Sequence, residues 1–287
     1  MSRNLAVRIS VALIAIPIIL WFAYRGQWWL FGMVALLAAV AILEFLIREG
    51  QKPGGLLFWV VVLTMAALFY ALASGSLPGG WDVRPFASSA PLIFLAFFIM
   101  SGVLISVGRD APDLLFRRYT RLVWGVLYVG ALYPFVFLLG QTVRLPYADS
   151  FTGGDCLLFL FGLLWVGDTA AMAVGSWFGR RRLAPGVSPN KTIEGFVGGL
   201  AGALAIGVIM VFWKFRAVAW YHVLVVAGGC SVLGQLGDLV ESAWKRSLGI
   251  KDSSAIIPGH GGVLDRFDSL LFAAPFMYFY LRAFITG

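Results

Sequence analysis

Residues 157–178 read LLFLFGLLWVGDTAAMAVGSWF, an apolar run with a single ionisable side chain, Asp168. About 20 apolar residues are enough for a helix to cross the hydrocarbon core of a bilayer. The rest of the chain is similar, because 60% of its 287 residues are hydrophobic and only 13% are charged. Soluble domains have roughly 45–50% apolar and about 25% charged residues. The sequence therefore predicts an all-α, polytopic integral membrane protein.

Nine segments are apolar enough to be predicted as transmembrane helices. They lie at about 5–24, 28–47, 56–74, 90–107, 122–141, 156–178, 193–213, 220–241 and 268–285. The first has the charge and apolar run of a signal peptide, but the aromatic residues at its end are typical of a membrane interface and favour a span. We expect a single membrane domain over residues 1–287, with N-terminal spans in 1–150 and catalytic spans and cytoplasmic loops in 151–287.

The basic residues are distributed unevenly between the two predicted sides of the membrane. With the N-terminus in the cytoplasm, only six of the 22 Lys and Arg residues fall on the far side: Arg25, Arg84, Arg144, Lys214, Arg216 and Arg282. Cytoplasmic loops of membrane proteins are enriched in basic residues. The distribution predicts a multi-pass protein of the cell (inner) membrane, with a cytoplasmic N-terminus and active site and a C-terminus on the opposite side. The net charge of +8 then reflects topology and anionic lipid rather than a nucleic-acid partner.

Asp168 is placed deep in its predicted span, where an unpaired carboxylate costs at least about 2.5–3.5 kcal/mol. One interpretation is that Thr169 or a nearby backbone group satisfies it at a helix break. The other is that Asp168 binds or pairs with a cation, which is the default hypothesis for an acid within a membrane.

A second group of polar residues follows in LGQLGDLVESAWKRS, residues 233–247. Helical spacing places four side chains on one face: Asp238, Glu241, Ser242 and Lys245. Glu241 and Lys245 are spaced for a local salt bridge, whereas Asp238 lies one turn deeper. Gly234 and Gly237 beside it predict either a close helix approach or a break.

Two more acids, Asp265 and Asp268, are three residues apart and would point the same way on a helix. Aligned carboxylates repel each other unless a cation lies between them. Oxygen ligands favour Mg²⁺ over zinc, so we predict a metal site made by these two residues with Asp238, and with Asp168 as a further candidate ligand. Asp238, Lys245, Asp265 and Asp268 are the predicted catalytic residues.

Two loops are predicted to bind phosphate groups. PGHGG, residues 258–262, contains His260, Gly261 and Gly262; glycines let backbone N–H groups approach a phosphate, although this loop could equally be a plain turn and His260 an ordinary polar residue. SPNKT, residues 188–192, offers Ser188, Asn190 and Lys191. A helix beginning near Thr192 would present its positive end to an anion, or Thr192 would simply cap it.

These groups together indicate chemistry on phosphates. Carboxylates for a metal and cations for phosphates, without a Ser-His-Asp or Cys-His arrangement, favour phosphoryl or nucleotidyl transfer over acyl transfer. Such transfers depend on positioning and on neutralising charge, and they need no nucleophile from the protein.

Residues 242–269, SAWKRSLGIKDSSAIIPGHGGVLDRFDS, resemble the signature of the phosphatidate cytidylyltransferase (CDP-diacylglycerol synthase) family. The matching positions are Ser242, Lys245, Arg246, Lys251, Asp252, Pro258, His260, Gly261, Gly262, Asp265, Arg266 and Asp268. GDLVES, SPNKTIEGFVGG and GDTAAMAVGSWFGR also resemble the family, so the resemblance covers roughly residues 160–270. Met172 stands where the family commonly has Tyr, and Asn190 where it often has Lys, which puts substrate preference or activity in doubt but leaves the acids intact.

The resemblance implies that CTP and phosphatidate are converted to CDP-diacylglycerol and pyrophosphate, in phospholipid biosynthesis, with Mg²⁺ required and a second cation left open. It also implies that Lys191, Lys245, Arg246 and Lys251 contact phosphates. The alternatives are a CTP- or ATP-dependent lipid or polyprenol kinase and, in a different class, a transporter of phosphorylated anions. A transporter accounts less well for a cluster confined to one face. Acyl-chain preference, the lipid entry path and the oligomeric state, a homodimer included, stay open.

Overall fold

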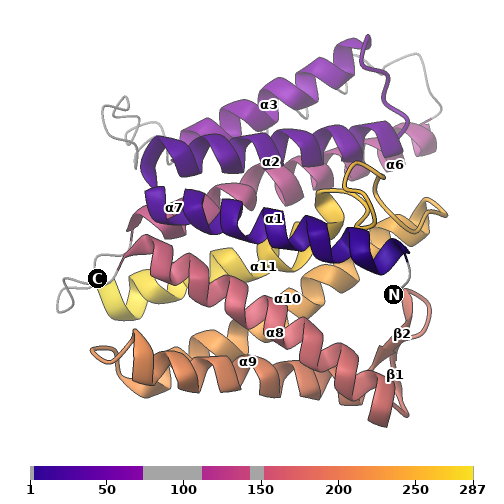
Figure 1. The fold of residues 1–287 in the computed structure, drawn as a ribbon. Coiled ribbons are helices and arrows are strands. Elements are labelled where there is room, and N and C mark those ends of the chain that lie inside the picture. Colours follow the sequence, from indigo (N-terminus) through magenta and orange to yellow (C-terminus); the bar gives the residue numbers. More distant parts are fainter. Residues whose placement is uncertain (1–2, 74–111, 143–151, 287) are drawn as a thin grey trace.

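The computed structural model describes residues 3–73, 112–142 and 152–286 (Figure 1). The predicted span at 90–107 lies outside the described residues, as do the basic residues Arg84, Arg109 and Arg144.

Helices make up nearly all of the described chain. The N-terminal part contains α1 (Arg3–Arg25), α2 (Gln27–Arg48), α3 (Leu56–Ala73), α6 (Pro112–Gly125), a π-helical segment (Val126–Ala131) and α7 (Tyr133–Thr142). The C-terminal part contains α8 (Gly153–Phe178), strands β1 (Arg182–Ala184) and β2 (Ser188–Thr192), α9 (Ile193–Trp213), α10 (Trp220–Ser247), α11 (Leu264–Leu281) and a final π-helical segment (Arg282–Thr286).

Within the described ranges, six helical segments are long and apolar enough to cross a membrane: Gln27–Arg48, Leu56–Ala73, Tyr119–Gln141, Gly153–Phe178, Ile193–Trp213 and Trp220–Ser247. A shorter apolar stretch, Ser10–Arg25, belongs to α1. The predicted all-α, polytopic architecture is confirmed, whereas the number of nine spans stays a prediction.

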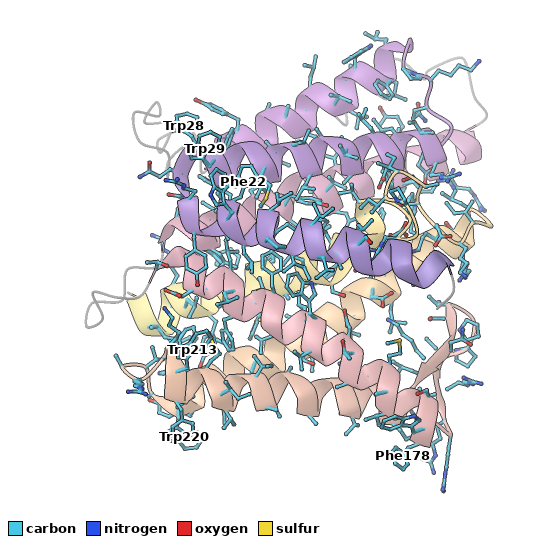
Figure 2. All side chains as sticks on the ribbon, in the orientation of Figure 1. Phe22, Trp28, Trp29, Phe178, Trp213 and Trp220 are labelled. Atoms are coloured by element: carbon cyan, nitrogen blue, oxygen red, sulfur yellow. The ribbon has the colours of Figure 1, made fainter. Side chains whose placement is uncertain are left out.

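The helices lie side by side, with α1–α3 along one side of the molecule, α8 and α9 along the other, and α10 and α11 between them (Figure 1). The N-terminal end of α1, the strands and the loop before α11 lie at one end of the bundle, and the C-terminus lies at the other. Exposed aromatic side chains mark both ends: Trp28, Trp29, Trp213 and Trp220 at one, Phe178 at the other (Figure 2). Aromatic residues concentrate at membrane–water interfaces.

Between the helices lies a continuous apolar core, in which Phe45, Tyr133, Phe137 and Phe159 are almost completely buried. Many large apolar residues on the outer faces are instead exposed, Phe212 by 70%. Such faces suit lipid, because lipid tails are as apolar as the side chains that they contact. Cys156 and Cys230 are both free and buried, so they contribute to the packing of this core.

Gly237 brings α10 and α11 into direct backbone contact. A Cβ atom at this position would lie 2.8 Å from the carbonyl oxygen of Asp268, so any larger residue would push the helices apart. Helix α10 continues unbroken past this point. Of the two predicted alternatives, Gly237 therefore allows a close approach of two helices and does not break α10. The next residue, Asp238, is thereby placed beside the first turns of α11.

Strands β1 and β2 form an antiparallel hairpin, in which Arg182 faces Thr192 and Ala184 faces Ser188. The hairpin was not predicted from the sequence, because SPNKT lacks the alternating apolar pattern of a strand. The predicted helix start is confirmed: Thr192 is the N-cap of α9, and its Oγ1 accepts a hydrogen bond of 3.1 Å from the Gly195 amide. The hairpin thus fixes Lys191 directly before a helix N-terminus.

At the other end of α8, Asp155 ties three helices together. It forms a capping box with Thr152, accepts a 3.0 Å hydrogen bond from the Tyr24 hydroxyl on α1 and pairs with Lys214, which follows α9, at 3.1 Å. The side chain of Asp155 is only 1% exposed, so its charge depends on these partners.

We expect Asp155→Ala to lower the free energy of unfolding by about 2 kcal/mol, because a cap and a buried ion pair are lost together. Thermal unfolding in detergent measures this as a fall of several degrees in the midpoint. Lys52→Gln, at an exposed position, is the control and should leave the midpoint unchanged; equal midpoints for both variants would contradict the role of Asp155.

Candidate active site

Three acids converge where α10 meets α11. Asp238, Glu241 and Asp268 each place a carboxylate oxygen within 4.8 Å of the others. Glu241 is fully buried and Asp268 nearly so, whereas Asp238 is partly exposed. The spacing of Asp238 and Glu241 on α10 and the close approach at Gly237 bring this group together. Asp238 and Asp268 lie close together, as predicted. Glu241 belongs to the same group, which was not predicted.

The donor set fits a hard divalent cation. Three carboxylates supply only oxygen ligands, as Mg²⁺ prefers. Oε1 of Glu241 is buried without a hydrogen-bond partner among the described residues, and an orphaned buried carboxylate oxygen is costly unless a cation reaches it. The other oxygen, Oε2, accepts a 2.6 Å hydrogen bond from Lys245, so the predicted Glu241–Lys245 pair is confirmed.

Asp265 lies apart from the group of three, on the other side of Lys245. Its Oδ1 accepts a 2.7 Å hydrogen bond from Lys245, and its Oδ2 accepts bonds of 2.8 Å from the amides of Ser253 and Gly262 and from the Ser253 hydroxyl. Burial by itself would raise the pKa of this carboxyl, which precedes the apolar segment, but the hydrogen bonds from Lys245 and Gly262 lower the pKa to about 2. The predicted metal role of Asp265 stays a prediction, and its contacts are those of a loop anchor.

Lys191 reaches the acid group from the hairpin. Its Nζ lies 2.6 Å from Oδ2 of Asp238, and Ser242 donates a 3.2 Å hydrogen bond to the other oxygen of Asp238. Both members of the ion pair are partly exposed, with side-chain exposures of 26% and 35%. The pair is therefore accessible to a ligand, and it joins a predicted phosphate-binding residue to a predicted metal ligand.

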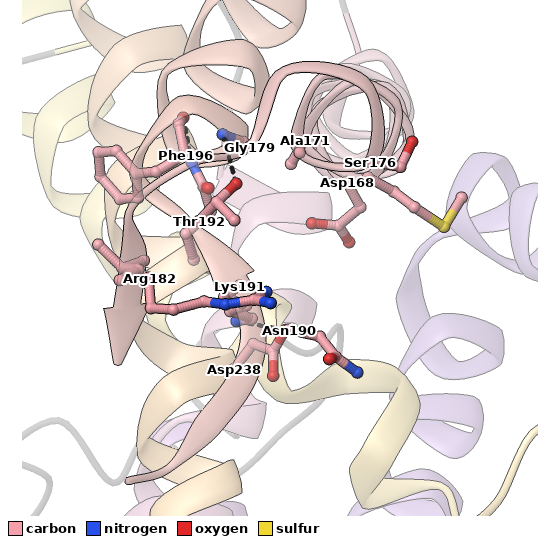
Figure 3. Close-up of a pocket in the computed structure, with 15 residues that line it drawn as sticks. Asp168, Ala171, Ser176, Gly179, Arg182, Asn190, Lys191, Thr192, Phe196 and Asp238 are labelled. Atoms are coloured by element: carbon pink, nitrogen blue, oxygen red, sulfur yellow. Dashed lines mark hydrogen bonds and ion pairs between the residues drawn. The ribbon is translucent and has the colours of Figure 1, made fainter. Parts of the chain in front are cut away.

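A cavity of about 680 Å³ opens beside this pair, between α8, the hairpin, α9 and α10. Its polar lining includes Asp168, Arg182, Asn190, Lys191 and Asp238. Figure 3 shows Asp168, Lys191 and Asp238 around one space. Asp168 thus faces a cavity rather than lipid, and its hydroxyl neighbour Thr169 donates instead to the carbonyl of Trp165. The interpretation that Thr169 satisfies Asp168 has no support from this contact.

A second cavity, of about 840 Å³, extends to the same acids from α1 and α2. One part is apolar and is formed by residues of α1, α2 and α8, among them Ala15, Ile18 and Leu37. The other part is lined by charged and polar residues: Asp238, Lys245, Asp252, His260, Asp265, Arg266 and Asp268. Asp168 and Asp238 line both cavities, so the polar and the apolar space meet at these two carboxylates.

The other predicted phosphate-binding residues are more scattered. Arg246 donates to the carbonyls of Val187 and Ile250, at 3.3 and 2.8 Å, and Lys251 is exposed. His260 lines the second cavity, with Nδ1 3.4 Å from the Pro258 carbonyl oxygen. Ser188 lies in β2, opposite Ala184. The roles of these residues toward phosphate stay predictions.

The glycine loop is shaped chiefly by contacts within the protein. Gly261 has a φ of +85°, which favours glycine. The Gly262 amide donates to Asp265, and a Cβ at Gly262 would lie 2.0 Å from the Ser253 hydroxyl oxygen. This loop therefore holds Asp265, and its predicted contact with a phosphate stays a prediction.

Comparison with known proteins identifies the family. The sequence profile of the cytidylyltransferase family matches residues 6–284. The chain belongs to this family. A phosphatidate cytidylyltransferase of Staphylococcus haemolyticus (strain JCSC1435) is 35% identical over 276 residues, which is 94% of this chain and 96% of that protein. The enzyme of the same name from Staphylococcus aureus (strain COL) is 34% identical over 277 residues, again 94% of this chain and 96% of that protein.

A phosphatidate cytidylyltransferase of Bacillus subtilis (strain 168) is 49% identical over 122 residues, 42% of this chain and 45% of that protein. The resemblance seen at residues 160–270 is thus part of a match that includes the N-terminal helices. Those helices belong to the cytidylyltransferase family as much as the signature does.

Two acids in and around this site, Glu241 and Glu44, were not predicted from the sequence to belong to it. Glu241 was assigned only to a salt bridge, although its position on one face with Asp238 was a signal for the acid group. Glu44 lies in the apolar segment 28–47 and received no role, yet it is 2% exposed and contacts the signature loop. The rule that singled out Asp168, an acid inside an apolar segment, would have found Glu44 as well.

We expect Asp268→Asn and Asp238→Asn to weaken binding of Mn²⁺, a spectroscopic substitute for Mg²⁺, by about 100-fold or more, because even an indirect partner of a metal ligand is worth 10–100-fold. Titration of free Mn²⁺ by electron paramagnetic resonance on the purified protein measures this. Asp155→Asn, at the far end of α8, serves as control and should bind Mn²⁺ as the wild type does.

The same titration on Asp265→Asn tests whether Asp265 binds the metal or only anchors the loop. A loss as large as that of Asp268→Asn would add Asp265 to the ligands, and wild-type affinity in Asp268→Asn and Asp238→Asn would contradict the metal site.

Proposed function

We propose that this protein is a phosphatidate cytidylyltransferase, which converts CTP and phosphatidate to CDP-diacylglycerol and pyrophosphate. The observation that carries the proposal is the meeting of a polar and an apolar cavity at Asp168 and Asp238. Such a site lets a water-soluble anion and a lipid reach the same carboxylates from different sides. Membership of the cytidylyltransferase family and the names of the full-length relatives support the same reaction.

CTP is proposed to occupy the polar cavity. Arg182, Asn190 and Lys191 line it, and α9 begins at its edge behind Thr192. Cationic side chains and the free amides of a helix N-terminus both favour the charges of a triphosphate. With Asn190 where the family often has Lys, one positive charge fewer is available, so Lys191 and Arg182 carry more of the contact.

Phosphatidate is proposed to bind in the second cavity. Its acyl chains would lie between α1, α2 and α8, where the lining is apolar, and its phosphate would reach the charged part near Lys245, His260 and Arg266. A ligand with one apolar and one anionic end matches a cavity that has an apolar part and a charged part. The opening between helices would also let the lipid enter sideways from the bilayer.

The Lys191–Asp238 ion pair suggests how the site accepts its ligands. Each partner neutralises the charge of the other in this ion pair. A phosphate can replace Asp238 as the partner of Lys191, and a divalent cation can replace Lys191 as the partner of Asp238. The exchange keeps both charges compensated, so binding of nucleotide and of metal should favour each other.

Asp238, Glu241 and Asp268 are proposed to hold Mg²⁺, and Asp168, which faces the same cavities, is a candidate ligand for a second cation. The bound ion would neutralise charge on the phosphates and on the leaving pyrophosphate. Lys191 and Lys245 are placed to bring the two anions together despite their mutual repulsion.

The transfer itself makes few demands on the protein. An anionic oxygen of the phosphatidate phosphate attacks the α-phosphorus of CTP, a new P–O bond forms, and the bond from that phosphorus to the bridging oxygen breaks to release pyrophosphate. No proton has to be removed from the nucleophile. The protein therefore has to supply positioning and charge neutralisation rather than a base. A lipid alcohol, the acceptor of a kinase, would need one.

The orientation in the membrane is likewise proposed. The N-terminal end of α1, the hairpin and the loop before α11 lie at one end of the bundle (Figure 1), and the predicted cytoplasmic segments hold most of the basic residues. We place this end in the cytoplasm, where CTP is available, and the C-terminus on the opposite side.

The direct test is the purified protein in detergent with CTP, phosphatidate and Mg²⁺. We expect release of pyrophosphate in equal amount with a lipid that has gained a cytidylyl group. Release of a nucleoside diphosphate would indicate the kinase instead, and the absence of any product that depends on both substrates would overturn the proposal and favour the transporter.

Within this assay, Lys191→Ala should raise the KM for CTP by about 10–100-fold, the worth of one or two charge-assisted hydrogen bonds. Arg216→Ala removes a cation near the opposite end of α9 and is the matched control; it should leave KM unchanged. An unaltered KM in Lys191→Ala would contradict the contact with the triphosphate.

The lipid path gives a separate prediction. Ala15→Trp fills the apolar part of the second cavity, so it should favour dioctanoyl over dioleoyl phosphatidate, raising the ratio of their kcat/KM values several-fold, because long chains lose contact area. Leu13→Trp is the control, since Leu13 lies two residues away on α1 and is 69% exposed. An equal ratio in both variants would contradict an acyl-chain site beside α1.

A further inference from the structure

Glu44, on α2, binds the loop that precedes α11. Its Oε1 accepts hydrogen bonds of 2.6 Å from the Ser254 hydroxyl and 2.9 Å from the Val263 amide. Its Oε2 accepts a bond of 2.9 Å from the Leu264 amide and lies 3.2 Å from the Ser253 hydroxyl oxygen, whose single proton is shared with the closer Asp265. At 2% exposure, this carboxylate depends on three unshared donors and on the shared Ser253 hydroxyl to offset the loss of water.

The four donors come from the two ends of one loop. Ser253 and Ser254 begin it, Val263 and Leu264 end it, and the PGHGG turn lies between. The amides of Val263 and Leu264 are among the first of α11, which has no side-chain cap of its own. A helix N-terminus needs acceptors for its free amides and attracts negative charge. Glu44 therefore supplies the capping acceptors that the N-terminus of α11 lacks, from a helix more than 200 residues earlier in the chain.

From Glu44, hydrogen bonds continue into the acid group. The Ser253 hydroxyl contacts both Glu44 and Oδ2 of Asp265, at 3.2 and 2.8 Å. Asp265 then accepts from Lys245 at 2.7 Å, and Lys245 donates to Glu241 at 2.6 Å. A network of this kind has defined positions only when every member is satisfied.

Gly262 makes the fit at Glu44 close. A Cβ atom there would lie 2.6 Å from one oxygen of Glu44 and 2.7 Å from the other. The end of α2 adds two further contacts to the same region: Arg48 donates to the Ser253 carbonyl, and the Trp244 indole donates to Glu49 at 2.9 Å. The loop is thus held from one side by α2.

We propose that Glu44 is a positioning residue of the active site: it fixes the loop 252–263 and the first turn of α11, and thereby the places of Asp265 and Asp268. The proposal rests on the proposed function only for its kinetic readout. Glu44 touches neither substrate nor metal in this scheme and acts through the residues that do.

The test is Glu44→Gln, which keeps the shape of the side chain. The amide retains one acceptor oxygen, but its NH₂ group faces a backbone amide that cannot accept a hydrogen bond. We expect the hydrogen-exchange rates of the loop before α11 and of the first turn of α11 to rise by about tenfold or more, because the hydrogen bonds from this segment to Glu44 are weakened. Mn²⁺ affinity should fall by about tenfold, as for a residue that orients a metal ligand.

The kinetic readout distinguishes positioning from binding. With Mg²⁺ saturating, we expect kcat to fall by about 10–100-fold while KM for CTP stays within about twofold, because no residue of the loop 252–263 lines the polar cavity of Arg182 and Lys191. Ser254→Ala removes one donor from the same carboxylate and should move exchange, Mn²⁺ affinity and kcat in the same direction by a smaller factor.

Asp155→Asn is the matched control, a buried carboxylate at a helix N-terminus at the far end of the bundle. It should lower thermal stability while loop exchange and Mn²⁺ affinity stay as in the wild type. If Asp155→Asn changed them as much as Glu44→Gln does, Glu44 would be a general stabilising residue and the proposal would fail.

Two other outcomes overturn the proposal. Wild-type loop exchange and Mn²⁺ affinity in Glu44→Gln would show that the Glu44 carboxylate is not needed to hold the loop. Lost activity with unchanged exchange would show that Glu44 acts directly on a ligand. Because exchange and Mn²⁺ binding need no substrate, they test Glu44 even if the wild-type protein transfers no cytidylyl group.

Discussion

Lys245 lies between two carboxylates, 2.6 Å from Glu241 and 2.7 Å from Asp265, and the arrangement of the site depends on it. Several acids are gathered there within a largely apolar protein, and carboxylates so close to one another repel unless cations offset them. Lys245 compensates one side of this cluster and Lys191 the other. Oε1 of Glu241 is buried without a hydrogen-bond partner in the described part of the chain, and a metal bound by this cluster would complete the compensation. Charge balance, together with the close packing at Gly237, thus constrains where the last turns of α10 and the first turns of α11 can lie.

The N-terminal helices are part of this balance, although none of the predicted site residues comes from them. Glu44 supplies the acceptor that the first amides of α11 lack, and α1 with α2 forms one wall of the cavity that ends at the acids. A chain in which 1–150 were only a membrane anchor would not need a buried carboxylate there. The match of the cytidylyltransferase family to residues 6–284 agrees with this shared role of the two parts.

How much the sequence could predict differed between helices and loops. Apolar segments located the described spans closely, and helical spacing predicted the face with Asp238, Glu241 and Lys245, because both depend on local periodicity. The place of Asp265 could not be predicted in this way. The i, i+3 rule correctly puts it on the same helix as Asp268, but its oxygens turn to Ser253 and Gly262, whose positions depend on how the loop folds against α2. Contacts between residues some 200 positions apart leave no local pattern.

The hairpin could not be predicted for the same reason, because its role depends on contacts that leave no local pattern in the sequence. SPNKT is too polar to read as a strand, yet pairing with β1 fixes Lys191 at the start of α9, where its ammonium group reaches Asp238. At the other end, Asp155 ties α8 to α1 and to the end of α9. Helix α8, which carries Asp168, is therefore held at both ends, and α1 is joined to it at the end away from the acids. A cavity between α1 and α8 can then admit a long apolar molecule beside the acids without disturbing the hairpin that holds Lys191.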